Sequence, residues 1–395
     1  MITREIHPLL LELAGSYPVV TITGPRQAGK TTLAKMAFPT YHYCNLEHPE
    51  IRWMAQNDPA GFFKHHAPPL IVDEIQRVPE LLSYIQVMVD ESGKNGQYIL
   101  TGSQQFNLNA AITQSLAGRT ALLTLLPFSL KEIAEATFGM ESLTRDKLLV
   151  KGGLPRIYHQ RQNPLMAYRN YLQTYVERDV RQLLNVKEIV VFEKFLKLLA
   201  GRVGQVLNMS SLATDVGVSI ATINHWVSVL EASYILFRLN PYYENFGKRI
   251  IKAPKIYFVE TGLACYLLGI ENEHQLAQNP LLGGLFENLI VTETLKARLN
   301  KGLDPNIFFF RDSNQFEVDL LLKWRNELIP VEIKSASTWH DSFAKGLLKF
   351  KSISPSCSNG LIIYGGDQYF STTDKVKVAG YWHLTLGLEL LISGS

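Results

Sequence analysis

A glycine-rich segment near the N-terminus, residues 24–31 with the sequence GPRQAGKT, restricts the possible folds of this chain more than any other segment. It fits the pattern G-x-x-x-x-G-K-[ST], in which backbone N–H groups surround phosphates, the lysine reaches the β- and γ-phosphates and the hydroxyl ligates Mg²⁺. A strand pattern at 18–23 precedes it and a helical pattern at 32–37 follows, so a helix dipole also favours an anion here. The sequence therefore predicts a nucleoside triphosphate site. Its predicted phosphate-binding residues are Gly24, Pro25, Arg26, Gln27, Ala28, Gly29, Lys30, Thr31 and Thr32.

Two adjacent acids end a short apolar run at 69–74, PLIVDE. Such a run is typical of a buried parallel strand whose carboxyl end faces a ligand. We expect Asp73 to hold Mg²⁺ through a water molecule, with the Thr31 hydroxyl as a second ligand, and Glu74 to polarise the water that attacks the γ-phosphorus. A solvated turn is the alternative for an isolated acidic pair, but the upstream loop favours the metal site. Glu74 is the residue predicted to turn binding into hydrolysis.

Two further catalytic candidates lie downstream of a third strand pattern at 97–101. The strand beside the acidic one often presents a polar side chain to the attacking water, and either Ser103 or Gln104 fits that role. Arg119, in the segment SLAGR, is a candidate to stabilise charge on a γ-phosphate in its own or in a neighbouring subunit. A surface position is an equal alternative for Arg119, because the sequence alone does not place it.

Composition limits the remaining possibilities. A chain of 395 residues, 46% hydrophobic and 19% charged, has room for two or three ordinary globular domains. The net charge of +3 is too small to indicate nucleic-acid binding by itself, so any basic surface has to be local. Three scattered cysteines favour a reducing cytosol, and no apolar run reaches the ~18 residues of a membrane span. We therefore expect a cytoplasmic protein without a membrane partner.

The first half of the chain divides into two predicted regions. Strand and helix patterns alternate over residues 1–150, which predicts an α/β unit with a largely parallel sheet. Residues 151–195 read as a helical lid or linker after a glycine–proline break. Arg178 and Arg181 of this lid either touch phosphate or lie on a solvated helix face. The strand patterns of the first region lie near 18–23, 41–44, 69–73, 97–101 and 120–125.

Residues 196–275 have the pattern of a winged helix-turn-helix. A capped short helix at 209–216 is followed by a tight turn at Gly217 and a second helix at 220–232. Two β patterns, at 234–239 and 255–259, complete this module.

The side chains that such a module would use to bind DNA are only partly present. In the candidate recognition helix, the large side chains best able to form polar contacts are His225 and Trp226. Helices that recognise bases in a DNA groove usually carry Arg, Lys, Asn or Gln instead. The loop between the β patterns is more basic, with Lys248, Arg249 and Lys252. Contact of this loop with a DNA backbone and internal packing of the module are both open alternatives.

Residues 276–395 carry a second group of charged residues. A helix pattern at 285–293 contains Glu287, and strand patterns follow at 307–310, 316–322 and 328–333, the last two joined by residues 323–327. Period-two alternation places Glu317 and Asp319 on one face of the first hairpin strand, and it places Glu332 and Lys334 on one face of the second.

Asp319, followed across the hairpin by Glu332-Ile333-Lys334, resembles the core of the PD-(D/E)xK nuclease superfamily. The resemblance implies that Asp319, Glu332 and the Ile333 carbonyl hold a divalent metal beside a scissile phosphate, with Glu287 as an additional acid. Lys334 then orients or deprotonates water. Val318 stands where the name-giving proline is expected, and cleavage itself is an open question because many nuclease-like domains have lost it.

The whole combination resembles the prokaryotic AAA-type ATPases that carry a C-terminal domain of unknown function with a nuclease-like core. The resemblance runs from the P-loop through 70–76, 101–103, 115–119, 177–180 and 317–319 to 332–334. It implies an α/β architecture of four parts: an AAA-type P-loop core (1–150), a helical lid (151–195), a winged-helix-like module (196–275) and a nuclease-like domain (276–395). It also implies ATP with Mg²⁺ as ligands and a cytoplasmic location.

Two functional hypotheses follow. The first is an ATP-hydrolysing protein that acts on DNA through the C-terminal domain. The second is a nucleotide-regulated switch with an inactive nuclease-like domain and a protein partner. Assembly into a homo-oligomer is compatible with both, since a role for Arg119 in a neighbouring subunit requires neighbours.

Overall fold

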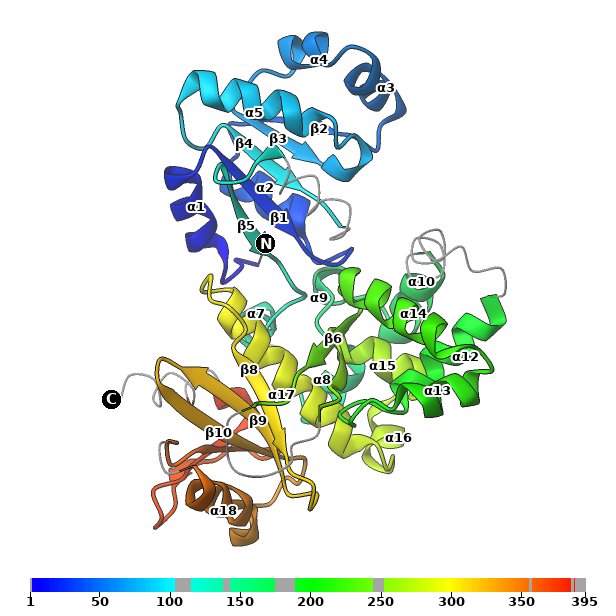
Figure 1. Ribbon diagram of the computed structural model, residues 1–395, viewed down its shortest axis with the longest axis vertical. Helices are drawn as coiled ribbons and strands as arrows, with labels where there is room; N and C mark the ends of the chain where they lie inside the picture. Colours follow the sequence, from blue (N-terminus) through cyan, green and yellow to red (C-terminus); the bar gives the residue numbers. More distant parts are fainter. Residues whose placement is uncertain are drawn as a thin grey trace.

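The computed structural model describes residues 2–103, 115–137, 143–174, 189–243, 252–354, 357–384 and 387. Figure 1 shows an N-terminal sheet covered by helices, a largely helical middle region and a C-terminal sheet. The long helix α17 (Leu282–Leu299) packs against β10 of the C-terminal sheet and against α15 and β7 of the middle region. The predicted residues Gln104, Arg178, Arg181, Lys248 and Arg249 lie outside the described residues.

The N-terminal unit contains a five-stranded sheet in the order β2-β3-β4-β1-β5, and every strand pair in it is parallel. The predicted parallel P-loop sheet is therefore confirmed, with strand bounds within a residue or two of expectation. The strands are β1 (Val19–Thr23), β2 (His42–Asn45), β3 (Leu70–Asp73), β4 (Tyr98–Thr101) and β5 (Thr120–Thr124). The helices are α1 (His7–Ser16), α2 (Lys30–Ala37), α3 (Pro49–Asn57), α4 (Pro59–His65), η1 (Ile75–Arg77) and α5 (Leu81–Ser92).

Alternating side chains of the central strands pack into two separate apolar cores, one on each face of the sheet. Val19 and Val72 belong to one core, whereas their neighbours Val20 and Ile71 belong to the other. Strands buried on both faces need no polar alternation, which is why β1, β3 and β4 appear in the sequence as continuous apolar runs. Because β4 lies between β1 and β3, the segments that follow all three strands meet at one edge.

The middle region is helical with one two-stranded sheet. Its helices α13 (Met209–Val216) and α14 (Ile220–Ala232) are joined by a turn in which Gly217 has φ +90°, and Ser219 caps α14 by accepting from Thr222 N. Strands β6 (Leu236–Leu239) and β7 (Lys255–Phe258) pair antiparallel. The other helices are α7 (Leu130–Ala136), α8 (Arg145–Lys151), α9 (Pro155–His159), α10 (Pro164–Tyr171), α12 (Ile189–Ala200), α15 (Thr261–Leu267) and α16 (Glu273–Ala277).

One large side chain of the candidate recognition helix α14 is buried. Trp226 is only 6% exposed and packs at ring-centroid distances of 5.2 Å from Phe192 and 5.1 Å from Phe195 on α12. The indole is therefore part of the apolar core and is not available to read a nucleic-acid groove. His225 and Lys252 are exposed.

The C-terminal unit contains a six-stranded sheet in the order β12-β13-β11-β10-β9-β8. The hairpin turn is tighter than predicted: Trp324 pairs with Glu327, so Arg325 and Asn326 alone connect β9 to β10, with Arg325 at φ +52°. The strands are β8 (Ile307–Arg311), β9 (Glu317–Trp324), β10 (Glu327–Lys334), β11 (Leu361–Tyr364), β12 (Tyr369–Ser371) and β13 (Lys377–Gly380). The remaining helices are η3 (Asp341–Ala344), α18 (Lys345–Ile353) and η4 (Tyr381–His383).

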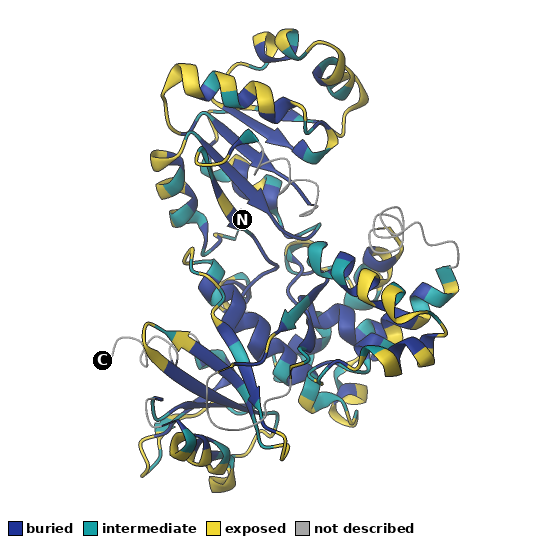
Figure 2. Ribbon diagram, viewed as in Figure 1, coloured by how far each residue is buried: buried dark blue, intermediate teal, exposed yellow. Residues whose placement is uncertain are grey.

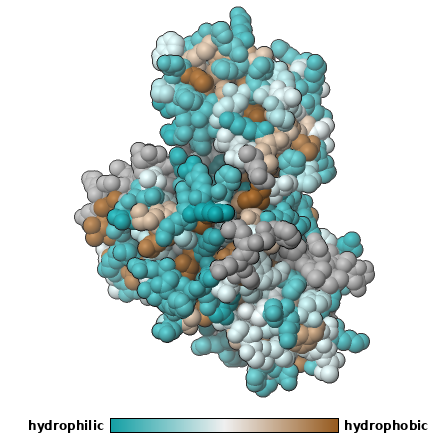
Figure 3. Space-filling view, turned by 180° about the vertical axis from the view of Figure 1, so that it is seen from behind, coloured by the Kyte–Doolittle hydropathy of each residue, from teal (hydrophilic) through white to brown (hydrophobic). Residues whose placement is uncertain are grey.

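The middle and C-terminal regions share one apolar core. A single cluster of buried side chains runs from Leu126 and Phe128 through α12–α15 and α17 to Leu384. Figure 2 shows this continuity as buried strands and helices that meet around α17. Seen from behind, the surface is mostly hydrophilic with scattered apolar residues (Figure 3). Among the described residues, no helix combines the length and apolar character that crossing a bilayer requires.

Candidate functional site

The glycine-rich segment forms a tight loop at the carboxyl edge of the N-terminal sheet. Gly24 has φ +140°, and a Cβ there would lie 2.1 Å from the Leu125 carbonyl oxygen. Gly29, at φ +93°, is the N-cap of α2, and Gln27 also adopts a positive φ of 63°. Both glycines are therefore required by the backbone, which turns back on itself before the helix begins. This is the geometry by which loop N–H groups and a helix N-terminus converge on an anion.

Lys30 is held inside this loop. Its ammonium donates to the carbonyl oxygens of Gly24 at 2.9 Å and Pro25 at 2.7 Å, and the residue is 6% exposed. Burial lowers the pKa of Lys30 to about 8, and the charges of Asp73 and Glu74 oppose this shift. The lysine predicted to reach phosphate thus lies close to both predicted acids, and its ammonium is bonded to loop carbonyls that it can leave for a phosphate.

Asp73 ends β3 beneath the start of α2, surrounded by hydroxyl donors. Thr31 Oγ1 donates to the two carboxylate oxygens at 2.9 and 3.0 Å, Tyr43 OH donates at 2.9 Å, and Thr101 Oγ1 also donates. Thr31 and Asp73, the predicted magnesium partners, are therefore in direct contact. A hydroxyl and a carboxylate in contact form an oxygen donor set that suits Mg²⁺, so the residues present fit the ion.

Glu74 follows β3 in a left-handed backbone conformation, φ +58°, which is uncommon for a residue with a side chain and often marks a functional site. Its carboxylate accepts from Ser103 Oγ at 3.1 Å and from Gln76 Nε2. Gln76 Nε2 also donates to Ser103 Oγ at 3.3 Å, which closes a ring of three side chains. Ser103 thus lies beside the predicted catalytic acid, as expected for the strand next to the acidic one.

Sequence reasoning missed three residues of this edge: Tyr43, Gln76 and Thr101. Thr101 and Gln76 lie inside segments that the family resemblance already included, but neither was assigned a role. Tyr43 lies in the second predicted strand. In the structure it pairs with Ile71 of β3, two residues before Asp73, and only this pairing of β2 with β3 brings its hydroxyl within 2.9 Å of the Asp73 carboxylate. A tyrosine in a strand carries no signal of its own, because aromatic residues are common there.

The structure contradicts a role for Arg119 at the nucleotide of its own subunit. The Arg119 carbonyl accepts from Val19 N at the first residue of β1, whereas the P-loop follows the last residue of that strand. Five residues of strand separate the two edges by roughly 13 Å. The guanidinium pairs with Asp90 at 2.6 and 2.8 Å on the surface. A role for Arg119 in a neighbouring subunit stays a prediction.

Arg4 connects the P-loop to the segment that leaves the sheet. This 7% exposed guanidinium donates to the carbonyl oxygens of Ala28 at 2.7 Å and Leu126 at 2.6 Å, and to Glu132 Oε1 on α7 at 2.9 Å. Because Ala28 lies within the loop itself, the Arg4 side chain joins the loop directly to α7.

A second connection comes from the middle region. Tyr234, which follows α14, donates its hydroxyl to Thr23 Oγ1 at 2.8 Å. Thr23 is the last residue of β1, directly before Gly24, and its hydroxyl also donates to the Leu123 carbonyl at 3.1 Å. Burial raises the pKa of Tyr234, so its hydroxyl stays a neutral donor. The helix-turn-helix segment is therefore hydrogen-bonded to the strand that carries the P-loop.

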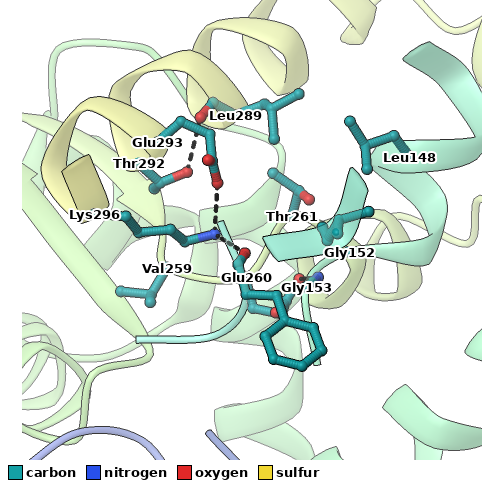
Figure 4. Close-up of a pocket in the computed structure, with 12 residues that line it drawn as sticks. Leu148, Gly152, Gly153, Val259, Glu260, Thr261, Leu289, Thr292, Glu293 and Lys296 are labelled. Atoms are coloured by element: carbon teal, nitrogen blue, oxygen red, sulfur yellow. Dashed lines mark hydrogen bonds and ion pairs between the residues drawn. The ribbon is translucent and has the colours of Figure 1, made fainter. Parts of the chain in front are cut away.

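Buried charges join the middle region to α17 (Figure 4). Lys296 donates to Glu293 Oε1 at 2.7 Å and to the Phe128 carbonyl at 2.8 Å, and Glu293 accepts from Leu130 N at 2.7 Å. Glu260 lies opposite Lys296 and accepts from Gly153 N at 2.8 Å. These residues border a cavity of about 10 Å³, which is close to the space that one water molecule occupies.

The acids of the second predicted site lie near one another. Glu287 on α17, Glu317 and Asp319 on β9, and Glu332 on β10 form a group that we call the carboxylate cluster. Asp319 Oδ2 accepts from Ile333 N at 2.8 Å, and Lys334 pairs with Glu332 at 2.5 Å. Burial raises the pKa of Asp319, and the nearby charges of Lys255 and Lys334 oppose this shift.

Lys255, a residue that sequence reasoning passed over, lies among these acids. Its ammonium is 2.7 Å from Glu287 Oε1 and 2.5 Å from Glu317 Oε1. Burial alone would lower the pKa of Lys255, but the charges of Glu287, Glu317 and Asp319 outweigh it and raise that pKa, so the group stays cationic.

A divalent metal does not fit the carboxylate cluster in this arrangement. The Lys255 ammonium already engages oxygen atoms of Glu287 and Glu317, and Lys334 engages Glu332, so cations of the chain occupy the positions that a metal ion would need. Within the ranges that the structure describes, no group of three or more His, Cys, Asp or Glu side chains is arranged to hold a metal ion.

Three family models match consecutive parts of the chain. An AAA domain matches residues 16–134, a domain of unknown function (DUF8612) matches residues 143–274, and a second one (DUF4143) matches residues 282–384. Together with the sheet order and the P-loop geometry, the first match places the N-terminal unit in the AAA class of nucleotide-binding ATPase domains.

The chain belongs to the same family as two mycobacterial proteins, Mb2031c of Mycobacterium bovis and Rv2008c of Mycobacterium tuberculosis, both described as uncharacterized. Each is 30% identical to it over 364 residues, which cover 91% of this chain and 79% of the relative. An uncharacterized protein of Haemophilus influenzae is 23% identical over 365 residues, covering 84% of this chain and 86% of that protein.

The similarity to solved structures is weak. The Walker-type ATPase PABY2304 of Pyrococcus abyssi is 15% identical and has a TM-score of 0.45, with 68% of this chain and 96% of that chain covered. AMPPCP-bound DnaA from Aquifex aeolicus is 15% identical with a TM-score of 0.30, covering 57% and 86%. The fold assignment therefore depends on the sheet order and on the AAA match.

Proposed function

We propose that this protein binds and hydrolyses Mg²⁺-ATP at the edge of the N-terminal sheet, and that nucleotide state is passed from there to the middle and C-terminal regions. One observation carries the first part: Lys30, Thr31, Asp73 and Glu74 converge on one edge, although the sequence separates the loop from the acids by some forty residues. Magnesium, when bound, supplies positive charge to the β- and γ-phosphates.

Different residues of the protein have different roles in the proposed hydrolysis. The loop N–H groups and the Lys30 ammonium hold the triphosphate, and Thr31 and Asp73 would hold the ion. Glu74 accepts a proton from the attacking water, while Ser103 and Gln76 hold the Glu74 carboxylate in position. These are the positioning and electrostatic roles that phosphoryl transfer requires.

Two contacts support the coupling part of the proposal. Arg4 bonds the P-loop to α7, and Tyr234 bonds β1 to the end of α14. Arg4 contacts Ala28 inside the loop, and Tyr234 contacts Thr23 directly before it, so both contacts are placed to respond when the loop binds phosphate. Because the middle and C-terminal regions share one apolar core, a shift of α14 would be transmitted to α17.

Removal of the Tyr234 hydroxyl tests this coupling. Tyr234→Phe deletes one buried hydrogen bond, worth about 1 kcal/mol, without opening a cavity. We expect ATP affinity within about threefold of wild type, but a loss of the nucleotide-dependent change in amide hydrogen exchange over residues 220–239. The measurement compares exchange with and without a non-hydrolysable ATP analogue.

Tyr84→Phe is the matched control for this experiment, since Tyr84 is 44% exposed on α5 and far from the loop in sequence. It should behave as wild type. If Tyr234→Phe kept the full exchange response to nucleotide, the coupling through β1 would be refuted.

A second candidate function is metal-dependent cleavage of DNA by the C-terminal region. It is favoured by the meeting of Glu287, Asp319 and Glu332 with Lys334, in the order expected from the nuclease-like resemblance. It is opposed by the ammonium of Lys255, which already pairs with Glu287 and Glu317. The nucleotide-regulated switch with a protein partner is therefore the function that we favour.

Nicking of plasmid or single-stranded DNA in Mg²⁺ or Mn²⁺ separates the two candidates. A nuclease would lose at least about 100-fold of its rate in Asp319→Ala and in Lys334→Ala, because both groups would act at the reacting phosphate. Absence of nicking, or nicking that both variants retain, would instead leave the switch as the function.

A further inference from the structure

A buried lysine of the middle region enters the carboxylate cluster of the C-terminal region. Lys255 is 1% exposed, and its ammonium bonds one oxygen of Glu287 and one of Glu317. The charge of Asp319 also acts on it. The lysine thus faces three of the four acids of the cluster, while Lys334 pairs with the fourth, Glu332.

The position of this ammonium is specified by the packing of β7 on α17. Period-two alternation puts Lys255 and Tyr257 on the same face of β7, and Tyr257 OH donates to the same Glu287 oxygen at 2.5 Å. One residue further on, Asn288 of α17 bonds both backbone groups of Phe258, accepting from its N–H at 2.7 Å and donating to its carbonyl at 2.8 Å. The strand and the helix are therefore held in one register, with the lysine aimed at the acids.

The charges in and around the carboxylate cluster nearly balance without a metal ion. Four carboxylates face three cations: Lys255, Lys334 and Arg311, the last of which lies 3.2 Å from Glu317 Oε2. The negative charge of the carboxylate cluster is therefore largely balanced by cations of the same chain. One of these cations, Lys255, belongs to the middle region, whereas the acids belong to the C-terminal region.

We propose that the Lys255 ammonium takes the place of a divalent cation in the carboxylate cluster, so that the C-terminal region is closed to metal while β7 is packed on α17. The proposal shares its acids with the second candidate function above but needs no cleavage. Removal of the positive charge should open the cluster to a hard divalent cation, since carboxylate oxygens are the ligands such ions prefer.

Binding of Mn²⁺ to the nucleotide-free full-length protein, followed by electron paramagnetic resonance, tests this proposal. Lys255→Met keeps the length of the side chain and removes its charge. We expect it to bind Mn²⁺ at least about tenfold more tightly than wild type. Lys255→Arg keeps the charge and should resemble wild type. The double variant Lys255→Met/Asp319→Asn should lose the gained binding, which would locate the ion in the cluster.

Folding of the variant is checked separately, because Lys255→Met leaves buried acids without their partner. Lys255→Gln is the second neutral variant, and its amide can still donate to Glu287. If neither neutral variant folds alone, refolding yield with and without Mn²⁺ becomes the measurement: rescue by Mn²⁺ supports the proposal, and no rescue overturns it. A folded neutral variant that binds Mn²⁺ no better than wild type also overturns it.

These outcomes are distinct from those of the DNA experiment. Tight Mn²⁺ binding by Lys255→Met without any DNA nicking would support the lysine as the resident cation and reject the nuclease. Equally tight binding by wild type and Lys255→Met, lost in Asp319→Asn, would reject the role of Lys255 and leave a metal site in the cluster.

Discussion

Glu74→Gln is expected to bind Mg²⁺-ATP with an affinity within about threefold of wild type and to hydrolyse it about 10²–10³ times more slowly. The amide keeps the shape of the side chain and a hydrogen bond with Ser103, but it no longer accepts a proton from water. General-base catalysis contributes factors of this size. Steady-state turnover and equilibrium binding of a fluorescent ATP analogue measure the two quantities separately.

Glu80→Gln provides the matched control for this substitution, because Glu80 is an exposed glutamate six residues further along the chain. It should leave both turnover and binding unchanged. Turnover of Glu74→Gln at the wild-type rate would show that another group activates the water, and the assignment of the catalytic acid would then be wrong.

Lys30→Ala is expected to lose at least about 100-fold in ATP affinity, or ~3 kcal/mol, because charge-assisted hydrogen bonds from a buried ammonium to phosphate have no substitute in the loop. The deletion also leaves the carbonyl groups of Gly24 and Pro25 without their donor. Isothermal titration with ATP measures the loss, and an unchanged unfolding midpoint confirms that the fold persists. Near-normal affinity would contradict the placement of the phosphates.

The pH dependence of wild-type binding provides a second check on the same lysine. Phosphate binds the protonated form, and in the free protein burial has lowered the pKa of Lys30 to about 8. Below pH 8 the ammonium is present and affinity should be flat with respect to this group. Above pH 8 the protonated fraction falls, so affinity should decrease by about tenfold per pH unit. Affinity that stays constant from pH 7 to pH 9.5 would refute the lowered pKa.

Local patterns were sufficient to predict much of the N-terminal unit. The P-loop is contiguous, so its residues specify their own turn, and the buried strands appear as apolar runs because both faces of the sheet are covered. Parallel strands end at a common edge, which is why Thr31, Asp73 and Ser103 could be assigned to one site before their contacts were known. A different argument grouped Asp319 with Glu332: the hairpin pattern of the two strands and the resemblance to a nuclease-like core.

Contacts between distant parts of the chain could not be predicted in this way. Tyr234 and Thr23 are 211 residues apart, and Arg4 and Glu132 are 128 residues apart, so no periodicity relates them. The sequence left the position of Arg119 open, because it places this residue next to a strand without showing which end of the sheet it occupies. The sequence also left the role of Trp226 undecided, because a buried and an exposed aromatic residue look alike on a single helix.

The phosphate-binding loop, its acidic partners and the second set of acids could all be identified from the amino-acid sequence, because each lies in a short, contiguous or periodic segment. Their surroundings became known only from the folded chain. It places Tyr234 of the middle region against the strand of the P-loop, and it places the ammonium of Lys255 among carboxylates from another region. Charge compensation and burial depend on neighbours in three dimensions, and the order of residues along the chain does not record them.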